Sequence, residues 1–204
     1  MAASPFLFVG NLLCLDFLNT EPVREGVRVD LLVSFEDLAR WLEAAGQLQP
    51  GAARTAAMRW GGSAEGRKTL REAKRLRAAL RAMAERLAAG KPVGDDVVRT
   101  INRVLASRPA YARLVRNSTG YAARLEPVTR GPLQLLAPVA ESAAWLLEHG
   151  EVSLVRQCEG NQCVLLFYDT TRNKSRRWCS MEECGGRAKA AAYYRRTRAR
   201  GAPG

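Results

Sequence analysis

Four cysteines in the last quarter of the chain constrain its fold more strongly than any other feature. They form two close pairs, Cys158-x4-Cys163 and Cys179-x4-Cys184, on either side of a 15-residue loop. Tetrahedral Zn²⁺ needs ligands that tight turns deliver in pairs, and residues 159–162 are a turn-forming sequence between two apolar segments. The spacing therefore predicts one Zn²⁺ per chain, held by four thiolates in a closed structural site.

The N-terminal apolar run, residues 6–18, bears on the cellular compartment. It is too short to span a membrane, it is interrupted by Gly10, Asn11 and Asp16, and no basic segment precedes it as in a secretory signal. We therefore expect a soluble cytoplasmic protein with no membrane contact. Thiols stay reduced in that compartment, which favours metal over disulfides, and a redox switch is the alternative for the paired cysteines. Cys14 is predicted to be a buried core thiol.

The charge distribution points to a polyanionic partner. The 204 residues contain 32 Lys and Arg against 20 Asp and Glu, which gives a formal net charge of +12. Residues 170–204 alone hold ten basic and two acidic side chains, the densest positive stretch in the chain. Such a surface is attracted to the phosphates of nucleic acid. A solvated basic face without any ligand is the alternative interpretation.

Residues 1–150 are predicted to form a mainly helical domain with a small β element. Apolar spacing predicts amphipathic helices over residues 34–45, 70–87, 95–105 and 139–147. Ser34 and Asp95 are the expected N-caps of the first and third helices, and the basic side chains of the second are expected to face solvent. Two strands, residues 111–116 and 121–128, flank a turn, and extended structure is expected to continue to Leu136.

Residues 151–204 are predicted to form a second, smaller module around the cysteines. Strands are expected at residues 153–157 and 164–168, and a helix at 187–200 with Ser180 as a candidate cap. This combination of knuckle, hairpin and helix resembles a treble-clef zinc finger. No linker separates the modules, so the finger is expected to pack on the helical domain. The predicted fold class is α+β: a mainly helical N-terminal domain with a small β element, plus a treble-clef-like four-cysteine zinc finger.

Two stretches of the chain resemble known families. The segment from Cys158 to Arg187, with Asp169-Thr-Thr-Arg-Asn and Arg176-Arg-Trp-Cys-Ser-Met-x-x-Cys-Gly-Gly-Arg, closely resembles the CGNR zinc finger. The preceding region resembles the ABATE domain, in Leu13-Cys-Leu-Asp-Phe-Leu-Asn-Thr, in the helix ending Trp41-Leu-Glu-Ala-Ala-Gly, and in Pro138-Val-Ala. The resemblance implies a bacterial stress-induced transcription regulator whose finger binds DNA. Gly186 replaces the Asn of the motif, and Thr171 replaces a usual Ser.

The finger carries the candidate nucleic-acid contacts. They are the basic residues on both sides of the second cysteine pair, namely Arg172, Lys174, Arg176, Arg177, Arg187, Lys189, Arg195, Arg196 and Arg198. Guanidinium groups can grip phosphates or read a guanine edge, and Tyr193 and Tyr194 could stack on bases. Because the metal anchors the loop before Cys179, its arginines are predicted to read bases, whereas those of the final helix are predicted to contact phosphates.

The helical domain carries fewer candidate functional residues. Asp16 and Asn19, polar residues in an apolar run, are candidates for a small-molecule pocket, although turn or capping roles are the preferred interpretation. The single histidine, His149, lies at a helix end, and no P-loop, dinucleotide-type glycine motif or zinc-protease motif is present. An enzyme is therefore not expected.

The sequence thus predicts a zinc-dependent, DNA-binding transcription regulator that responds to stress or to a ligand. One alternative is an RNA-binding or protein-interaction module, since the charge of the finger suits any polyanion. Another is a small-molecule sensor or enzyme domain with a structural finger. The target sequence, the effector and the oligomeric state do not follow from the sequence.

Overall fold

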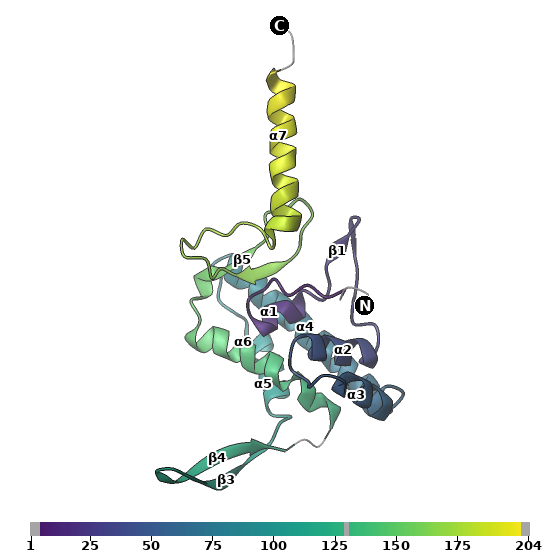
Figure 1. Ribbon diagram of the computed structural model, residues 1–204, viewed down its shortest axis with the longest axis vertical. Helices are drawn as coiled ribbons and strands as arrows, with labels where there is room; N and C mark the ends of the chain where they lie inside the picture. The colour runs from purple at the N-terminus through teal and green to yellow at the C-terminus, as the bar shows by residue number, and fades with distance from the viewer. Residues whose placement is uncertain (1–4, 129–130, 201–204) are drawn as a thin grey trace.

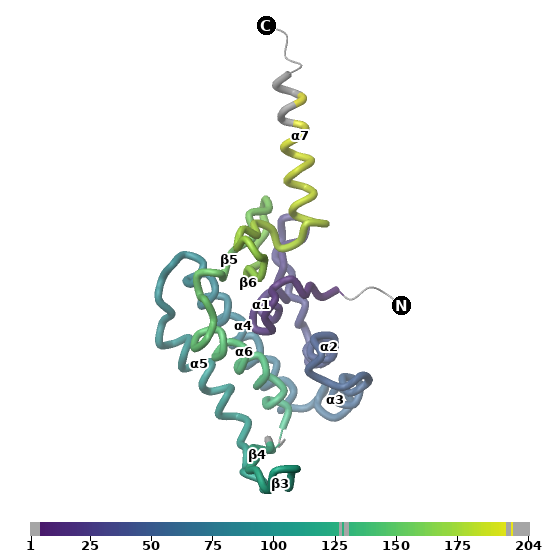
Figure 2. The backbone as a smooth tube through the Cα atoms, turned by 60° about the vertical axis from the view of Figure 1, so that its left-hand side comes forward, coloured from purple at the N-terminus to yellow at the C-terminus, as the bar shows by residue number. Residues whose placement is uncertain are grey.

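The computed structural model describes residues 5–128 and 131–200, and Figure 1 shows an elongated molecule with a helical body at its centre. Helix α7 (Gly186–Arg200) projects from one end, and the hairpin of β3 (Ala110–Asn117) and β4 (Gly120–Pro127) projects from the other. Figure 2 gives the same arrangement from a second direction. Within the described part of the chain, no helix combines the length and apolarity needed to cross a bilayer.

The centre of the body is built around α1 (Leu13–Leu18), which packs against α4 (Ala64–Ala88) and α6 (Ala137–His149). Helix α5 (Asp95–Leu105) packs against both α4 and α6. Four of the six residues of α1 are buried, among them Phe17, whose ring meets Trp41 edge to face at 4.9 Å. The sequence did not predict α1 as a helix, because a helix that is apolar on nearly every side shows no helical periodicity.

Helices α2 (Phe35–Ala44) and α3 (Ala52–Trp60) pack together on one side of the body. The predicted cap of α2 is confirmed: Ser34 Oγ accepts the Asp37 N–H at 3.1 Å, and Asp37 Oδ2 accepts the Ser34 N–H at 2.8 Å. Helix α3 was not predicted, since its alanine-rich sequence has high helix propensity but no large apolar stripe. Its first turn is capped from outside, by Glu43 Oε2 at 2.7 Å from the Ala53 N–H.

Three expectations for the helical domain were wrong. Gly94, in an extended conformation, is the N-cap of α5, and Asp95 lies in the first turn, where its charge favours the helix dipole. Extended structure does not continue to Leu136: a 3₁₀ helix, Pro132–Leu136, begins there, and proline suits a first helical turn. The basic side chains of α4 do not all face solvent, because Arg77 and Arg81 are only 4% and 8% exposed.

The remaining strands form small antiparallel pairs. Strand β1 (Val23–Arg24) pairs with β2 (Val27–Arg28), and β3 pairs with β4 in a register that runs from Ala110↔Pro127 to Asn117↔Gly120. In the finger, a 3₁₀ turn (Val152–Leu154) precedes β5 (Val155–Gln157), which pairs with β6 (Leu166–Tyr168). A short π-helical segment (Met181–Gly185) then leads into α7.

The finger packs on the helical body, as expected from the lack of a linker. The Asn19 amide forms two hydrogen bonds with the backbone of Leu166, donating to its carbonyl at 2.8 Å and accepting from its N–H at 3.1 Å. Arg81 donates to the Val164 carbonyl at 3.2 Å, and the Tyr168 N–H donates to the Gly10 carbonyl at 2.8 Å. A mainly helical N-terminal region with small antiparallel sheets and a C-terminal cysteine cluster is thus the observed fold.

Candidate metal centre and basic surface

The four cysteine sulfurs of the finger converge on one point. The Sγ atoms of Cys158, Cys163, Cys179 and Cys184 all lie within 4.8 Å of one another, and Cys163 and Cys179 are separated by 3.9 Å. Tetrahedral Zn²⁺ with Zn–S bonds of about 2.3 Å places its sulfur ligands about 3.8 Å apart. The arrangement therefore fits one Zn²⁺ ion whose four ligands all come from the protein.

Tight turns deliver the two cysteine pairs. After β5, the Cys158 N–H donates to the Leu165 carbonyl at 2.9 Å, and the Cys163 N–H donates to the Gly160 carbonyl at 3.0 Å. A Cβ at Gly160 would lie 2.7 Å from Cys184 Sγ, so only glycine fits against the second pair. On the other side, Ser180 Oγ accepts the N–H of Glu182 at 3.1 Å and caps the π-helical segment that presents Cys184.

The surroundings of the sulfurs favour thiolates. Cys158 Sγ accepts the N–H of Gly160 at 3.3 Å and that of Cys179 at 3.2 Å, and Arg187 donates to Cys184 Sγ at 3.2 Å. Hydrogen bonds from Cys163, then from Cys179, lower the pKa of Cys158 to about 2, while the same contacts raise the pKa of Cys163 to about 12. Four thiols this close cannot all ionise by themselves, and a divalent cation makes the fully ionised set tolerable.

A buried carboxylate shapes the loop between the cysteine pairs. Asp169, fully buried, accepts hydrogen bonds from the N–H and hydroxyl of Thr171, at 2.9 and 2.6 Å, and from the Arg176 N–H at 2.9 Å. Burial acts to raise its pKa, but these bonds lower it, so the carboxylate stays ionised. The sequence reasoning did not assign this role, although Asp followed by Thr two residues later is a recognisable turn signal. Thr171 keeps the hydroxyl that a Ser would supply.

Arg176 differs from its predicted role as a base-reading residue. Its Nε donates to the Trp178 carbonyl at 3.0 Å and its Nη2 to the Val9 carbonyl at 2.8 Å, and its guanidinium lies 4.1 Å from the centre of the Phe167 ring. These contacts tie the N-terminal segment to the finger. Base contacts by Arg176 would require breaking them, so the structure assigns Arg176 to the packing of the finger.

Replacing this arginine tests that assignment. We expect Arg176→Ala to lower the free energy of unfolding by about 2–3 kcal/mol, because two backbone carbonyls lose their charged donor. Arg177→Ala is the matched control, since Arg177 is exposed and pairs only with exposed Glu159, and we expect a change within about 0.5 kcal/mol. Chemical denaturation of the two zinc-loaded variants gives the comparison, and equal stabilities would contradict the assignment.

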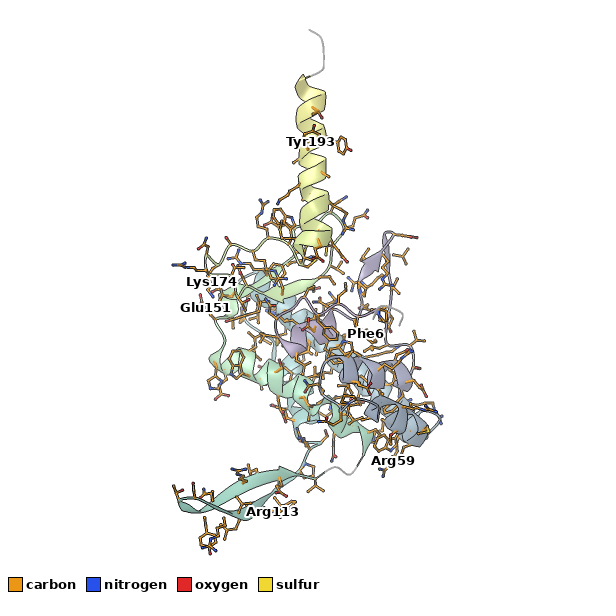
Figure 3. All side chains as sticks on the ribbon, in the orientation of Figure 1. Phe6, Arg59, Arg113, Glu151, Lys174 and Tyr193 are labelled. Carbon is orange, nitrogen blue, oxygen red and sulfur yellow. The ribbon has the colours of Figure 1, made fainter. Side chains whose placement is uncertain are left out.

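The other predicted contact residues are exposed. Arg172, Lys174, Arg177, Arg187 and Lys189 all lie on the surface, and the side chains of Arg195, Arg196 and Arg198 lie outside the described residues. Figure 3 shows Lys174 on the loop near the base of α7 and Tyr193 on the helix itself, pointing into solvent. Tyr193 and Tyr194 are 59% and 69% exposed, whereas Trp178 is half-buried against the cysteine cluster.

Gly186, at the position of the motif Asn, is the first residue of α7 and has helical backbone angles. A Cβ there would make its nearest contact at 3.4 Å, with the Met181 carbonyl oxygen, so a side chain would fit. Glycine is therefore not required sterically at this position. It is expected to weaken the start of α7 by about 0.5–1 kcal/mol relative to alanine.

Asp16 and Asn19 take the structural roles that the sequence favoured. Asp16 Oδ1 accepts the Gly10 N–H at 2.7 Å, and burial raises the pKa of its carboxyl to about 6. Asn19 is occupied by the Leu166 backbone. Two cavities of about 1240 and 780 Å³ flank the finger, one beside β1 and the cysteines and one beside the loop of Arg172, and neither is lined by Asp16 or Asn19.

Fold and site together define a class of protein in which a mainly helical domain carries a four-cysteine zinc finger. Residues 11–150 match the family model of ABATE, described as "Putative stress-induced transcription regulator", and residues 155–197 match that of the CGNR zinc finger. The chain therefore belongs to the ABATE family and ends in a CGNR zinc finger, which confirms the resemblance read from the sequence. No curated protein matches the sequence significantly.

Proposed function

We propose that this protein is a bacterial, cytoplasmic transcription regulator that binds DNA through its zinc finger and performs no catalysis. The observation that carries the proposal is the position of α7. The helix projects from the body, is fixed at its base beside the zinc ligands, and has no apolar face of its own. A helix that is polar on all sides does not leave the body to pack elsewhere in its own chain.

The dimensions and charge of α7 suit the major groove of DNA. Fifteen residues at 1.5 Å rise give a length of about 22 Å, and the groove admits one α-helix. Arg187 and Lys189 lie on its exposed first turns, and Tyr193 and Tyr194 are available to stack or to contact the backbone. Exposed Arg172, Lys174 and Arg177 on the adjacent loop would contact the flanking phosphates.

The proposed role of the helical domain is to receive a signal. Its contact with the finger is made by buried hydrogen bonds from Asn19 and Arg81, so a change in α1 or α4 would alter the position of the finger. Stress or a bound small molecule would act through this contact.

The salt dependence of DNA binding tests the proposed interface. We expect log affinity for duplex DNA to fall linearly with log salt, and the double variant Arg187→Glu, Lys189→Glu to weaken binding at least tenfold and flatten the slope by about two phosphates. The matched control is Lys68→Glu, Arg71→Glu on the exposed face of α4, which changes the net charge equally. Fluorescence anisotropy over a salt series measures both quantities.

If the α4 variant lost as much affinity as the α7 variant, general charge rather than the finger would account for binding. Undiminished affinity of the α7 variant, with its zinc retained, would place the DNA contact elsewhere. Selection of bound sequences from random duplexes by the wild-type protein would then supply the target sequence for the arginine variants.

A further inference from the structure

The β3–β4 hairpin stands apart from the rest of the molecule. It projects from the end of the body opposite α7, and among the described residues its strands make their extensive contacts only with each other (Figure 1). A lone two-stranded hairpin is marginally stable in water and gains independent stability when a further layer covers one of its faces. The position of this hairpin therefore calls for a covering partner.

The register shows that the two faces of the hairpin differ. One face holds Tyr111, Arg113 and Glu126, which are joined by hydrogen bonds of Tyr111 Oη and Arg113 Nη1 to the Glu126 carboxylate, both at 3.0 Å. The other face, here called the leucine face, holds Ala110, Ala112, Leu114, Arg116, Tyr121, Ala123 and Leu125. Leu114, Tyr121 and Leu125 are 68%, 70% and 75% exposed, so the apolar face is the bare one.

We propose that the leucine face packs against the leucine face of a second copy of this chain, so that the protein forms a two-fold dimer through its hairpins. In such a dimer the same surface is used twice, and each side chain must fit a side chain of the same face. The order of large and small residues on the leucine face meets that requirement.

Each cross-strand pair at the centre of the leucine face combines one leucine and one alanine, in alternating order: Ala112↔Leu125 and then Leu114↔Ala123. A two-fold axis between the faces, perpendicular to the strands, places Leu114 of one copy over Ala112 of the other. The same axis places Leu125 over Ala123, and Arg116 over Ala110. Large side chains thus meet small ones throughout, which is how packed layers interdigitate.

The alternative two-fold axis, parallel to the strands, also places leucines over alanines but brings Arg116 over Tyr121, so that two large side chains coincide. The perpendicular axis is therefore the better fit. Because a hairpin face is small, the dimer belongs at the low end of specific interfaces, below about 1,200 Å² in total, and it should be reversible and concentration-dependent.

Sedimentation velocity of the full-length, zinc-loaded protein, from low micromolar to submillimolar concentration, tests the proposal. We expect a monomer–dimer equilibrium that Leu114→Asp shifts to monomer. Ala112→Leu should weaken the dimer by about tenfold or more, although it adds apolar surface, because two leucines would then collide. The double variant Ala112→Leu, Leu114→Ala should restore dimerisation, since only the perpendicular axis keeps large over small after the exchange.

Met58→Asp is the matched control, since Met58 is a 72% exposed apolar residue on α3, far along the chain from the hairpin. Zinc content and circular dichroism verify that each variant is folded. A protein that is monomeric at every concentration, or a dimer that Ala112→Leu tightens, would overturn the proposal. Salt separates this inference from DNA binding: screening of the net charge should strengthen the dimer, whereas it weakens binding to DNA.

Discussion

Cys179→Ser is expected to abolish stoichiometric zinc binding and to unfold the finger, while Cys14→Ser leaves both intact. Cys179 is buried in the cluster, and its N–H donates to Cys158 Sγ, so a hydroxyl in its place removes a thiolate ligand from a site with no spare donor. Zinc contributes about 10–16 kcal/mol to the folding of small zinc-finger peptides. Without it the cysteine cluster has no comparable core: only Leu165 and Phe167 are buried with the three buried cysteines.

Two measurements check the zinc prediction. Metal analysis should give one zinc per wild-type chain and well below one for Cys179→Ser, and hydrogen exchange over residues 155–187 should rise in the variant while α5 stays protected. Cys14 is the internal control, because it is fully buried among apolar side chains and burial raises the pKa of its thiol to about 11. Full zinc content in Cys179→Ser, or loss of zinc in Cys14→Ser, would contradict the assignment of ligands.

The elements that the sequence predicted correctly are those with a local signal. The apolar stripe and the Ser34–Asp37 capping box identified α2, and two apolar segments around a polar turn identified the β3–β4 hairpin. Helices α1 and α3 lack such a signal, since the first is apolar on nearly every side and the second has no large apolar stripe. The cap of α3 comes from Glu43 in the preceding helix, a contact that depends on tertiary structure.

The candidate site divides in the same way. Spacing alone predicted the zinc site, because four cysteines in two close pairs leave few other arrangements. The roles of individual arginines could not be predicted, since Arg176 and Arg177 are neighbours in sequence yet one is bound by backbone carbonyls and the other by an exposed glutamate. Burial of Arg77 and Arg81 depends on α1 and the β1–β2 segment, which meet α4 only in the folded molecule.

Arg81→Ala is expected to destabilise the protein by about 3–5 kcal/mol and to loosen the contact between the finger and the body. Its Nη2 donates to the Leu18 carbonyl at 2.8 Å and its Nη1 to the Val164 carbonyl at 3.2 Å, so one guanidinium joins α1, α4 and the finger. Alanine leaves both carbonyls without this donor in a largely buried place. Burial lowers the pKa of Arg81, and nearby Glu21 partly opposes that shift.

Arg77→Ala provides the comparison that separates stability from coupling. Arg77 is also buried on α4, but it binds Asp30 at 2.6 Å and Thr20 at 3.1 Å and makes no described hydrogen bond to the finger. Both variants should unfold at lower denaturant concentration, yet only Arg81→Ala should raise hydrogen exchange in β6 under native conditions. Since a purely structural role for Arg81 would affect both variants alike, equal exchange in β6 would show that the finger is held by Asn19 and Arg176 rather than by Arg81.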